Sequence, residues 1–307
     1  MALAEDPLKN LPEMTAADYE TLGDNYLRQG NINLAFAQYD KALRLDPAQV
    51  RTRYKIGLLF LKKGLPEDAF KEFQEILKKD VHYALAYEGL GQSLFQLDNL
   101  WEAEKQFRLA IQFNPQLWQS HNILGVMYDR QQRFEEAYDE YRAAIALNRD
   151  QWALFNNLGM SHYYQGEYTR AIEAFLEALK LDDSQTKVYN NLGLALVKLG
   201  IYQKALEAFK KGGDEAKAYN NLGVIYLGER KHQEAIVAFE KAIELNPSYY
   251  LKASGNLKIA QKALADVDLV SVPKSTLLKA QMPNVDTPPQ AFERRSRISG
   301  DRSQPSD

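Results

Sequence analysis

The 307-residue sequence contains no cysteine. Disulfides, cysteine-based zinc sites, a thiol nucleophile and a lipid-modified cysteine are therefore excluded for this chain. The absence does not fix the compartment, because cysteine-free chains occur in reducing and in oxidising spaces.

Long apolar runs and a basic charge excess are also missing. No stretch approaches the about 18 to 20 apolar residues of a membrane-spanning helix, so we expect a soluble protein without membrane insertion. Residues 1–14 lack the apolar core of a signal peptide, which favours a cytoplasmic protein; the alternative is a periplasmic one whose upstream signal has been removed. The net charge of -3 argues against nucleic acid as a partner, because nucleic-acid-binding domains carry a strongly basic surface.

Signs of catalytic chemistry are sparse. The four histidines do not share metal-ligand spacing with a carboxylate partner, and no glycine-rich phosphate loop is present. Only about 40 residues follow the last expected helix, whereas a catalytic domain needs about 100 or more. We therefore expect no metal, no cofactor and no enzymatic activity.

The chain does contain a repeated Leu-Gly or Ile-Gly pair. Twelve residues after each glycine comes an alanine, and four residues later an aromatic. The pairs begin at Leu22, Ile56, Leu90, Leu124, Leu158, Leu192 and Leu222. The first five steps are 34 residues and the last is 30, and one fixed period indicates a stack of similar structural units.

Each unit reads as two helices. Tyr19, Leu22, Gly23 and Tyr26 follow at i, i+3, i+4 and i+7, the spacing of one helix face. A second helix begins after the break at Gly30 and stops before Pro47, since proline lacks the N–H that would continue a helix. Glycine inside a helix costs about 1 kcal/mol relative to alanine, so its recurrence predicts close packing of the two helices.

These residues resemble the tetratricopeptide repeat (TPR) family, whose pattern is Trp-x2-Leu-Gly-x2-Tyr, then Ala-x3-Phe, then Pro. The resemblance implies an all-α fold, a right-handed α-solenoid of helix-turn-helix units. We expect a flexible N-terminus (1–15), seven repeats, a capping helix (250–266) and a disordered tail (267–307). The repeats, numbered 1 to 7, are 16–49, 50–83, 84–117, 118–151, 152–185, 186–215 and 216–249. Arg53 and His121 depart from the pattern, because each replaces the first aromatic.

Asparagines on the expected first helices are the leading candidate binding residues. They are Asn122, Asn156, Asn157, Asn190, Asn191, Asn220 and Asn221. Asparagine is a poor helix former, so a compensating role is expected. The resemblance implies two such roles: contacts to the backbone of a peptide in the concave groove, or contacts between neighbouring repeats. We favour binding for the first asparagine of each pair and for Asn122, and leave both roles open for the second.

The remaining groove candidates are basic and aromatic residues near the ends of first helices: Lys187, Lys217, Arg130, Tyr163, Tyr164 and Lys198. Such residues suit acidic or aromatic peptides. The leading hypothesis is a non-enzymatic scaffold or adaptor that binds a protein segment or extended peptide, with envelope, pilus or secretion assembly as candidate settings. The alternatives are a homo-oligomeric platform and a targeting subunit that recruits an enzyme in trans. The tail could compete for the groove, dock elsewhere or be inert.

Overall fold

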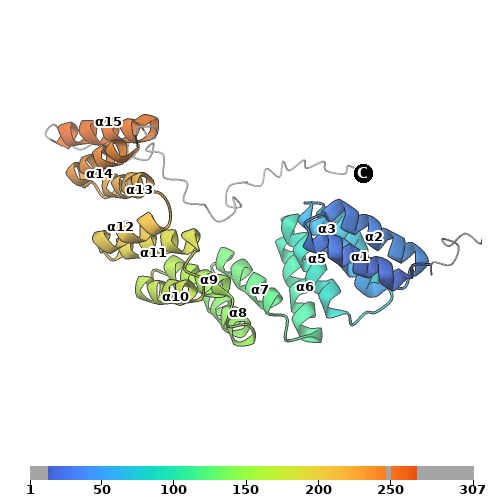
Figure 1. The fold of residues 1–307 in the computed structure, drawn as a ribbon. Helices are drawn as coiled ribbons and strands as arrows, with labels where there is room; N and C mark the ends of the chain where they lie inside the picture. The colour runs from blue at the N-terminus through green and yellow to red at the C-terminus, as the bar shows by residue number, and fades with distance from the viewer. Residues whose placement is uncertain (1–12, 247–249, 268–307) are drawn as a thin grey trace, which may run out of the picture. The chain divides into compact units, whose positions relative to one another are not determined.

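The computed structural model describes residues 13–246 and 250–267, and all regular secondary structure in these ranges is helical (Figure 1). The predicted all-α class is confirmed. Residues 1–12 and 268–307, which include most of the expected N-terminal and C-terminal segments, lie outside the described ranges. The helices are α1 (Ala16–Arg28), α2 (Ile32–Leu45), α3 (Val50–Lys62), α4 (Pro66–Leu77), α5 (Ala84–Gln96), α6 (Leu100–Phe113), α7 (Trp118–Arg130), α8 (Phe134–Leu147), α9 (Trp152–Tyr164), α10 (Tyr168–Leu181), α11 (Thr186–Lys198), α12 (Tyr202–Lys211), α13 (Glu215–Gly228), α14 (His232–Leu245) and α15 (Tyr250–Val267).

Odd-numbered helices from α1 to α13 are the first helices of the repeats, and even-numbered ones are the second helices. The helix α13 begins at Glu215, one residue before the expected start of repeat 7, because Asp214 caps it by accepting a hydrogen bond from the Lys217 backbone N–H. The short sixth repeat ends its second helix at Lys211, with Gly212 as the C-cap. The helix α15 follows the last repeat and packs against α14.

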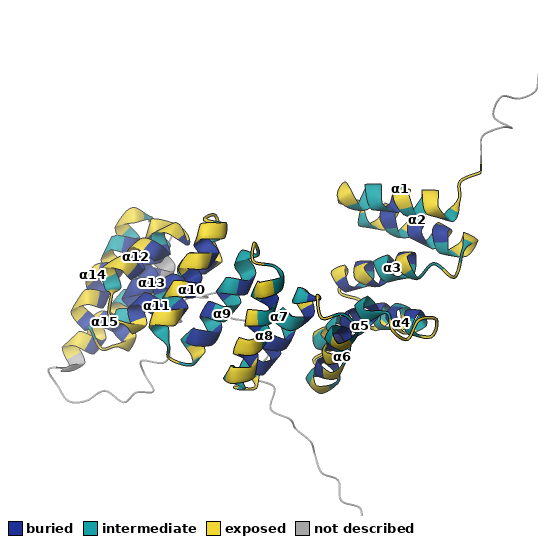
Figure 2. Ribbon diagram, turned by 90° about the horizontal axis from the view of Figure 1, so that it is seen from below, coloured by how far each residue is buried: buried dark blue, intermediate teal, exposed yellow. Residues whose placement is uncertain are grey.

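The helices form two compact units. The first unit runs to Ser161 and contains α1 to α8 with most of α9; the second unit starts at His162 and contains α10 to α15. From α1 to α8 in the first unit and from α10 to α15 in the second, each helix packs against the next one along the chain. Figure 2 shows that buried residues lie on the helix faces turned toward neighbouring helices, whereas exposed residues lie on the outer faces.

The recurring glycines let the two helices of a repeat approach each other. A Cβ on Gly125 would lie 2.7 Å from the Tyr141 ring, and one on Gly223 would lie 2.7 Å from the Phe239 ring. Four further repeats show the same contact, at Gly23, Gly57, Gly91 and Gly193. The aromatic rings are almost completely buried, which stabilises each by about 1.5 to 3 kcal/mol relative to exposure. The close helix packing predicted from the Leu-Gly pair is thus a contact of its glycine with this aromatic ring.

The core continues from repeat to repeat. In the first unit, Phe107 of α6, Leu124 of α7 and Tyr141 of α8 belong to one buried cluster. In the second unit, Phe239 of α14 packs with Ala260 of α15, so the last helix covers the apolar side of repeat 7. This is the role expected of a capping helix, because the end of a repeat stack otherwise exposes apolar surface.

The two departures from the aromatic pattern are accommodated by polar contacts to a glutamate of the second helix. Arg53 Nη1 lies 2.7 Å from Glu72 Oε2, and His121 Nδ1 lies 2.6 Å from Glu140 Oε2. Glu72 and Glu140 occupy the same position of the second helix in repeats 2 and 4. A polar link between the two helices therefore replaces the aromatic contact in both repeats.

Candidate functional site

Three of the candidate asparagines in the first unit form a chain of hydrogen bonds. Asn156 Nδ2 donates to Asn157 Oδ1 at 3.4 Å, and Asn157 Nδ2 donates to Asn122 Oδ1 at 2.9 Å. The second bond joins α9 to α7, the first helices of two successive repeats. The donation thus runs from Asn156 through Asn157 to Asn122, where the chain of hydrogen bonds ends.

Asn122 retains hydrogen-bonding capacity at the end of this chain. A side-chain amide offers two N–H donors and a carbonyl with two lone pairs. Its carbonyl accepts from Asn157, while its Nδ2 has no acceptor among the described residues. The residue is half-buried, so part of it is open to solvent.

Asparagines of the second unit make related contacts. Asn256 Nδ2 of α15 donates to Asn220 Oδ1 at 3.4 Å, and Asn190 Nδ2 donates to the carbonyl of Gly212 at 3.2 Å. Asn191 and Asn221 are buried, and Asn221 Oδ1 has no hydrogen-bond partner within the described part of the chain. In this unit the amides therefore lie mainly against neighbouring helices.

The sequence leaves both roles, peptide binding and inter-repeat contact, open for the second asparagine of each pair and favours binding for the first. In the structure the first asparagine takes part as well: the second asparagine of one helix donates to the first of the preceding one, as Asn157 does to Asn122. The cause is the stagger of successive first helices, which sets these two positions opposite each other. The peptide-binding role of the asparagines stays a prediction.

The other candidates lie in different surroundings. The Arg130 guanidinium lies 4.8 Å from the centre of the Phe95 ring in the first unit. In the second unit, the Tyr163 ring lies 5.5 Å from that of Tyr168. Lys187, Tyr164 and Lys198 are exposed, and Lys217 is half-buried. No single surface is defined for the whole set.

Asp129 is a polar residue of α7 that the sequence reasoning missed. Ser161 Oγ donates to its Oδ1 at 2.7 Å, and Tyr141 Oη donates to its Oδ2 at 2.9 Å. Burial raises the pKa of this carboxyl to about 6, although both hydrogen bonds oppose the rise. Perturbed carboxyl groups of this kind are candidates for functional sites.

The signal for Asp129 is present in the sequence. Its position in the repeat is otherwise apolar or aromatic, and the other six residues are Leu27, Leu61, Phe95, Tyr163, Val197 and Leu227. Asp129 also lies seven residues after Asn122, so both residues fall on one face of α7. Asn157 and Ser161, which contact them, are four residues apart and so share one face of α9. Asn122 and Asp129 therefore lie on the same face of α7, with Gly125 and Val126 between them.

Glu88 provides a second buried carboxyl. Ser120 Oγ donates to Glu88 Oε2 at 2.6 Å, which links α7 to α5. Burial raises the pKa of Glu88, and the hydrogen bonds from Ser120 oppose the rise. Unlike Asp129, Glu88 is only 4% exposed, so it is less accessible to a ligand.

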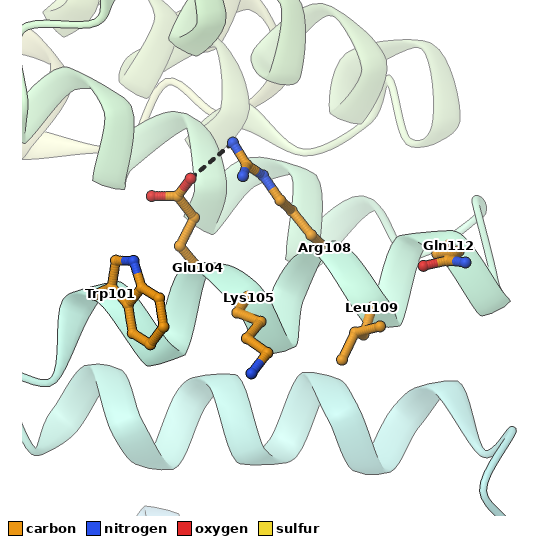
Figure 3. A pocket seen from close by; sticks show the side chains of 6 residues that line it. All are labelled: Trp101, Glu104, Lys105, Arg108, Leu109 and Gln112. Carbon is orange, nitrogen blue, oxygen red and sulfur yellow. Dashed lines mark ion pairs between the residues drawn. The ribbon is translucent and has the colours of Figure 1, made fainter.

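A shallow pocket of about 290 Å³ lies on α6, a second helix, and Figure 3 shows the side chains that line it. Trp101 is 75% exposed there, with Lys105 Nζ 5.8 Å from its ring centre. Arg108 is paired with Glu104 at 2.7 Å, so that cation is already compensated. The pocket is formed by one helix alone and was not singled out from the sequence.

None of the described helices combines the length and the apolar character needed to cross a lipid bilayer. Within the described ranges, no three residues of the metal-ligating types His, Cys, Asp and Glu come together as a group.

Family models match most of the repeat region. Models described as tetratricopeptide repeat match residues 54–117, 90–151 and 216–249, and a model described as TPR repeat matches residues 23–64 and 159–200. Tetratricopeptide repeat protein 37 of Xenopus laevis is 35% identical over 74 residues, and Superkiller complex protein 3 of Homo sapiens is 31% identical over 74 residues. Each match covers 24% of this chain and 5% of the relative, so the chain spans a small part of the length of these relatives.

Solved structures show a similar fold. A tetratricopeptide repeat protein from Parabacteroides merdae has a TM-score of 0.55 at 15% identity, over 80% of this chain and 98% of that chain. The C-terminal part of a TPR repeat-containing protein from Cytophaga hutchinsonii has a TM-score of 0.58 at 18% identity, over 77% and 98%. The APC/C hetero-tetramer Cut9-Hcn1 has a TM-score of 0.59 at 20% identity, over 82% and 49%. At these identities the likeness concerns the fold alone.

Proposed function

Because the chain belongs to the tetratricopeptide repeat family, we propose that it is a non-enzymatic scaffold that binds an extended segment of a protein partner on its first helices. Repeats of this family generally form protein–protein interaction scaffolds, since stacked helix pairs present extended binding surfaces. A setting in envelope, pilus or secretion assembly stays a prediction. The same holds for the homo-oligomeric and enzyme-recruiting alternatives.

One observation carries the proposal: the amide chain from Asn156 through Asn157 ends in the donors of Asn122. An extended peptide presents backbone carbonyl groups along its length, which such donors can meet. The amide is held in place by Asn157 before a ligand arrives, so less side-chain freedom is lost on binding. This contact reads the backbone and does not by itself demand a particular ligand sequence.

A peptide selection tests the proposal. The full chain is used to select binders from a phage-displayed library of random dodecapeptides, and affinities of the selected peptides are measured by fluorescence polarisation. Removing the donors with Asn122→Ala costs about 0.5 to 1.5 kcal/mol per hydrogen bond, so we expect binding to weaken about three- to tenfold.

The matched control is Asn33→Ala, which removes an exposed amide from the second helix α2. We expect it to bind the selected peptides as the parent does. Circular dichroism checks that both variants keep their helix content. If no peptide is selected above background, or if Asn122→Ala binds every selected peptide with parent affinity, this surface is not the binding site.

A further inference from the structure

The Asp129 carboxylate lies on the same face of α7 as Asn122 but has no cation beside it. Its hydrogen-bond partners are two neutral hydroxyl groups, those of Ser161 and Tyr141, and no ion pair to it is formed by the described residues. A carboxylate offers about four lone-pair sites, so two remain for a further donor. The side chain is half-buried, which leaves part of it open to a ligand.

A related aspartate in repeat 1 shows what is missing, although it lies three residues earlier in its repeat than Asp129 does. Asp24 Oδ1 accepts a hydrogen bond from Tyr39 Oη at 2.6 Å, as Asp129 does from Tyr141. The Lys55 ammonium donates to both oxygens of Asp24 at 2.7 Å, and it is supplied by the next first helix, α3. In repeat 4 the next first helix, α9, supplies the Ser161 hydroxyl to Asp129 and carries Asn157 at the position of Lys55. The cation that completes the site in repeat 1 is absent from repeat 4.

We propose that Asp129 recognises a basic side chain, lysine or arginine, of the peptide that binds beside Asn122. This inference rests on the proposed function and adds a ligand class to it. The ligand's ammonium or guanidinium group supplies to Asp129 the cation that Lys55 supplies to Asp24. Charge-assisted hydrogen bonds of this kind are stronger than neutral ones, and a partly buried carboxylate is less screened by water than an exposed one.

The spacing along α7 limits where the basic residue lies. Asn122 and Asp129 are seven residues apart, which is about 10.5 Å along a helix axis. An extended peptide rises about 3.3 Å per residue, so this distance corresponds to about three residues. The site therefore selects peptides in which a lysine or arginine follows or precedes the backbone contact at a fixed spacing of about three residues.

The peptides selected by the full chain provide the probe. We expect lysine or arginine to be enriched at one fixed position. For one such peptide, a matched version carries norleucine there, which keeps most of the aliphatic stem and removes the charge. The parent should bind the lysine peptide about tenfold or more tightly than the norleucine peptide, because a desolvated charge pair is lost.

Two variants separate charge from folding. Asp129→Asn keeps the shape, and Asp129→Leu introduces the residue type found at this position in repeats 1, 2 and 7. Both should reduce the preference for lysine over norleucine to about onefold, while the norleucine peptide binds nearly as to the parent. The control Asp24→Asn should keep the preference, because Lys55 already occupies that carboxylate.

The outcomes distinguish this inference from the proposed function. If selected peptides depend on Asn122 but show no basic position, the scaffold function stands and the role of Asp129 is overturned. The role is also overturned if Asp129→Asn retains the lysine preference. If no peptide binds, the proposed function itself fails.

Discussion

Repeats 1 and 4 both carry a tyrosine where the other second helices have phenylalanine, and in both the tyrosine donates to an aspartate. Tyr39 Oη lies 2.6 Å from Asp24, and Tyr141 Oη lies 2.9 Å from Asp129. The phenylalanines of the other repeats are Phe73, Phe107, Phe175, Phe209 and Phe239. The extra hydroxyl therefore occurs where an acceptor is present, and both pairs tie the two helices of their repeat together.

The pKa values of the two aspartates nevertheless shift in opposite directions. Burial would raise the pKa of Asp24, but the hydrogen bonds from Lys55 and Tyr39 outweigh it and hold the pKa below its usual value. Burial of Asp129 is stronger than the opposing bonds from Ser161 and Tyr141, and its pKa rises to about 6. The comparison teaches that the neighbouring first helix decides the direction of the pKa shift, since it supplies a lysine in one case and a serine in the other.

Removing the lysine should abolish this difference and has the largest expected effect. Lys55 is 17% exposed and pairs with both Glu20 and Asp24, so Lys55→Met leaves two partly buried carboxylates without that cation. We expect the free energy of unfolding at pH 7 to fall by about 2 to 3 kcal/mol, between the values for exposed and buried pairs.

The loss should shrink as the pH is lowered toward 4. In the variant, burial is no longer outweighed, so the pKa of Asp24 rises and the protonated group no longer needs a cation. Urea denaturation at pH 7 and pH 4.5 measures both values. An equal loss at the two pH values would contradict the assignment of Lys55 as the cause of the low pKa of Asp24.

The second prediction removes the charge of Asp129. The pKa of this group is about 6 in the folded state and about 3.9 unfolded, so the native state holds the proton more tightly. Its contribution to stability is therefore present below about pH 4 and is lost as the pH rises through 6. Asp129→Asn cannot ionise and should be about 2 kcal/mol more stable than the parent at pH 7.5, after about 1 kcal/mol is allowed for a weakened hydrogen bond.

The measurement is the difference between variant and parent in the free energy of unfolding, taken from pH 4 to 8. Other groups such as Glu88 titrate in both proteins and cancel in this difference. The difference should rise with pH and level off above about pH 6.5. A difference that stays flat would show that Asp129 has an ordinary pKa.

The fold follows from the sequence because its signal is repeated. The Leu-Gly or Ile-Gly pair occurs seven times. The contact of its glycine with the buried aromatic, as between Gly125 and Tyr141, involves only residues of the same repeat. Even a repeat with a departure such as His121 keeps its helices, since Glu140 compensates. A departure in one repeat therefore leaves the pattern of the other repeats recognisable.

The candidate site follows less well, because it depends on contacts between repeats. The partner of Asn122 is Asn157, 35 residues later, and the partner of Asp129 is Ser161, 32 residues later. Which residues meet depends on the stagger of successive first helices, and the repeat pattern alone does not give that stagger. Asp129 was nevertheless marked in the sequence as a charge at an otherwise apolar position. Leu158 illustrates the same limit, because it matches the core pattern but is only half-buried.

The last prediction compares the two tyrosines directly and includes the smallest expected effect, that of Tyr39→Phe. Tyr141→Phe and Tyr39→Phe each introduce the residue used by the other five repeats, so the ring and its packing against Gly125 or Gly23 are retained. At pH 7, Tyr141→Phe removes one of the two donors of a carboxylate that has no cation, and a hydrogen bond to a charged group is worth about 1.5 to 3 kcal/mol. Tyr39→Phe leaves Asp24 paired with Lys55, so we expect a loss of only about 0.5 to 1 kcal/mol. At pH 4.5 the loss for Tyr141→Phe should decrease, because Asp129 is then mostly protonated, whereas the loss for Tyr39→Phe should change little. Thermal denaturation of the two variants at both pH values measures this. Equal losses for the two variants at pH 7 would mean that Lys55 does not compensate Asp24 as the comparison holds.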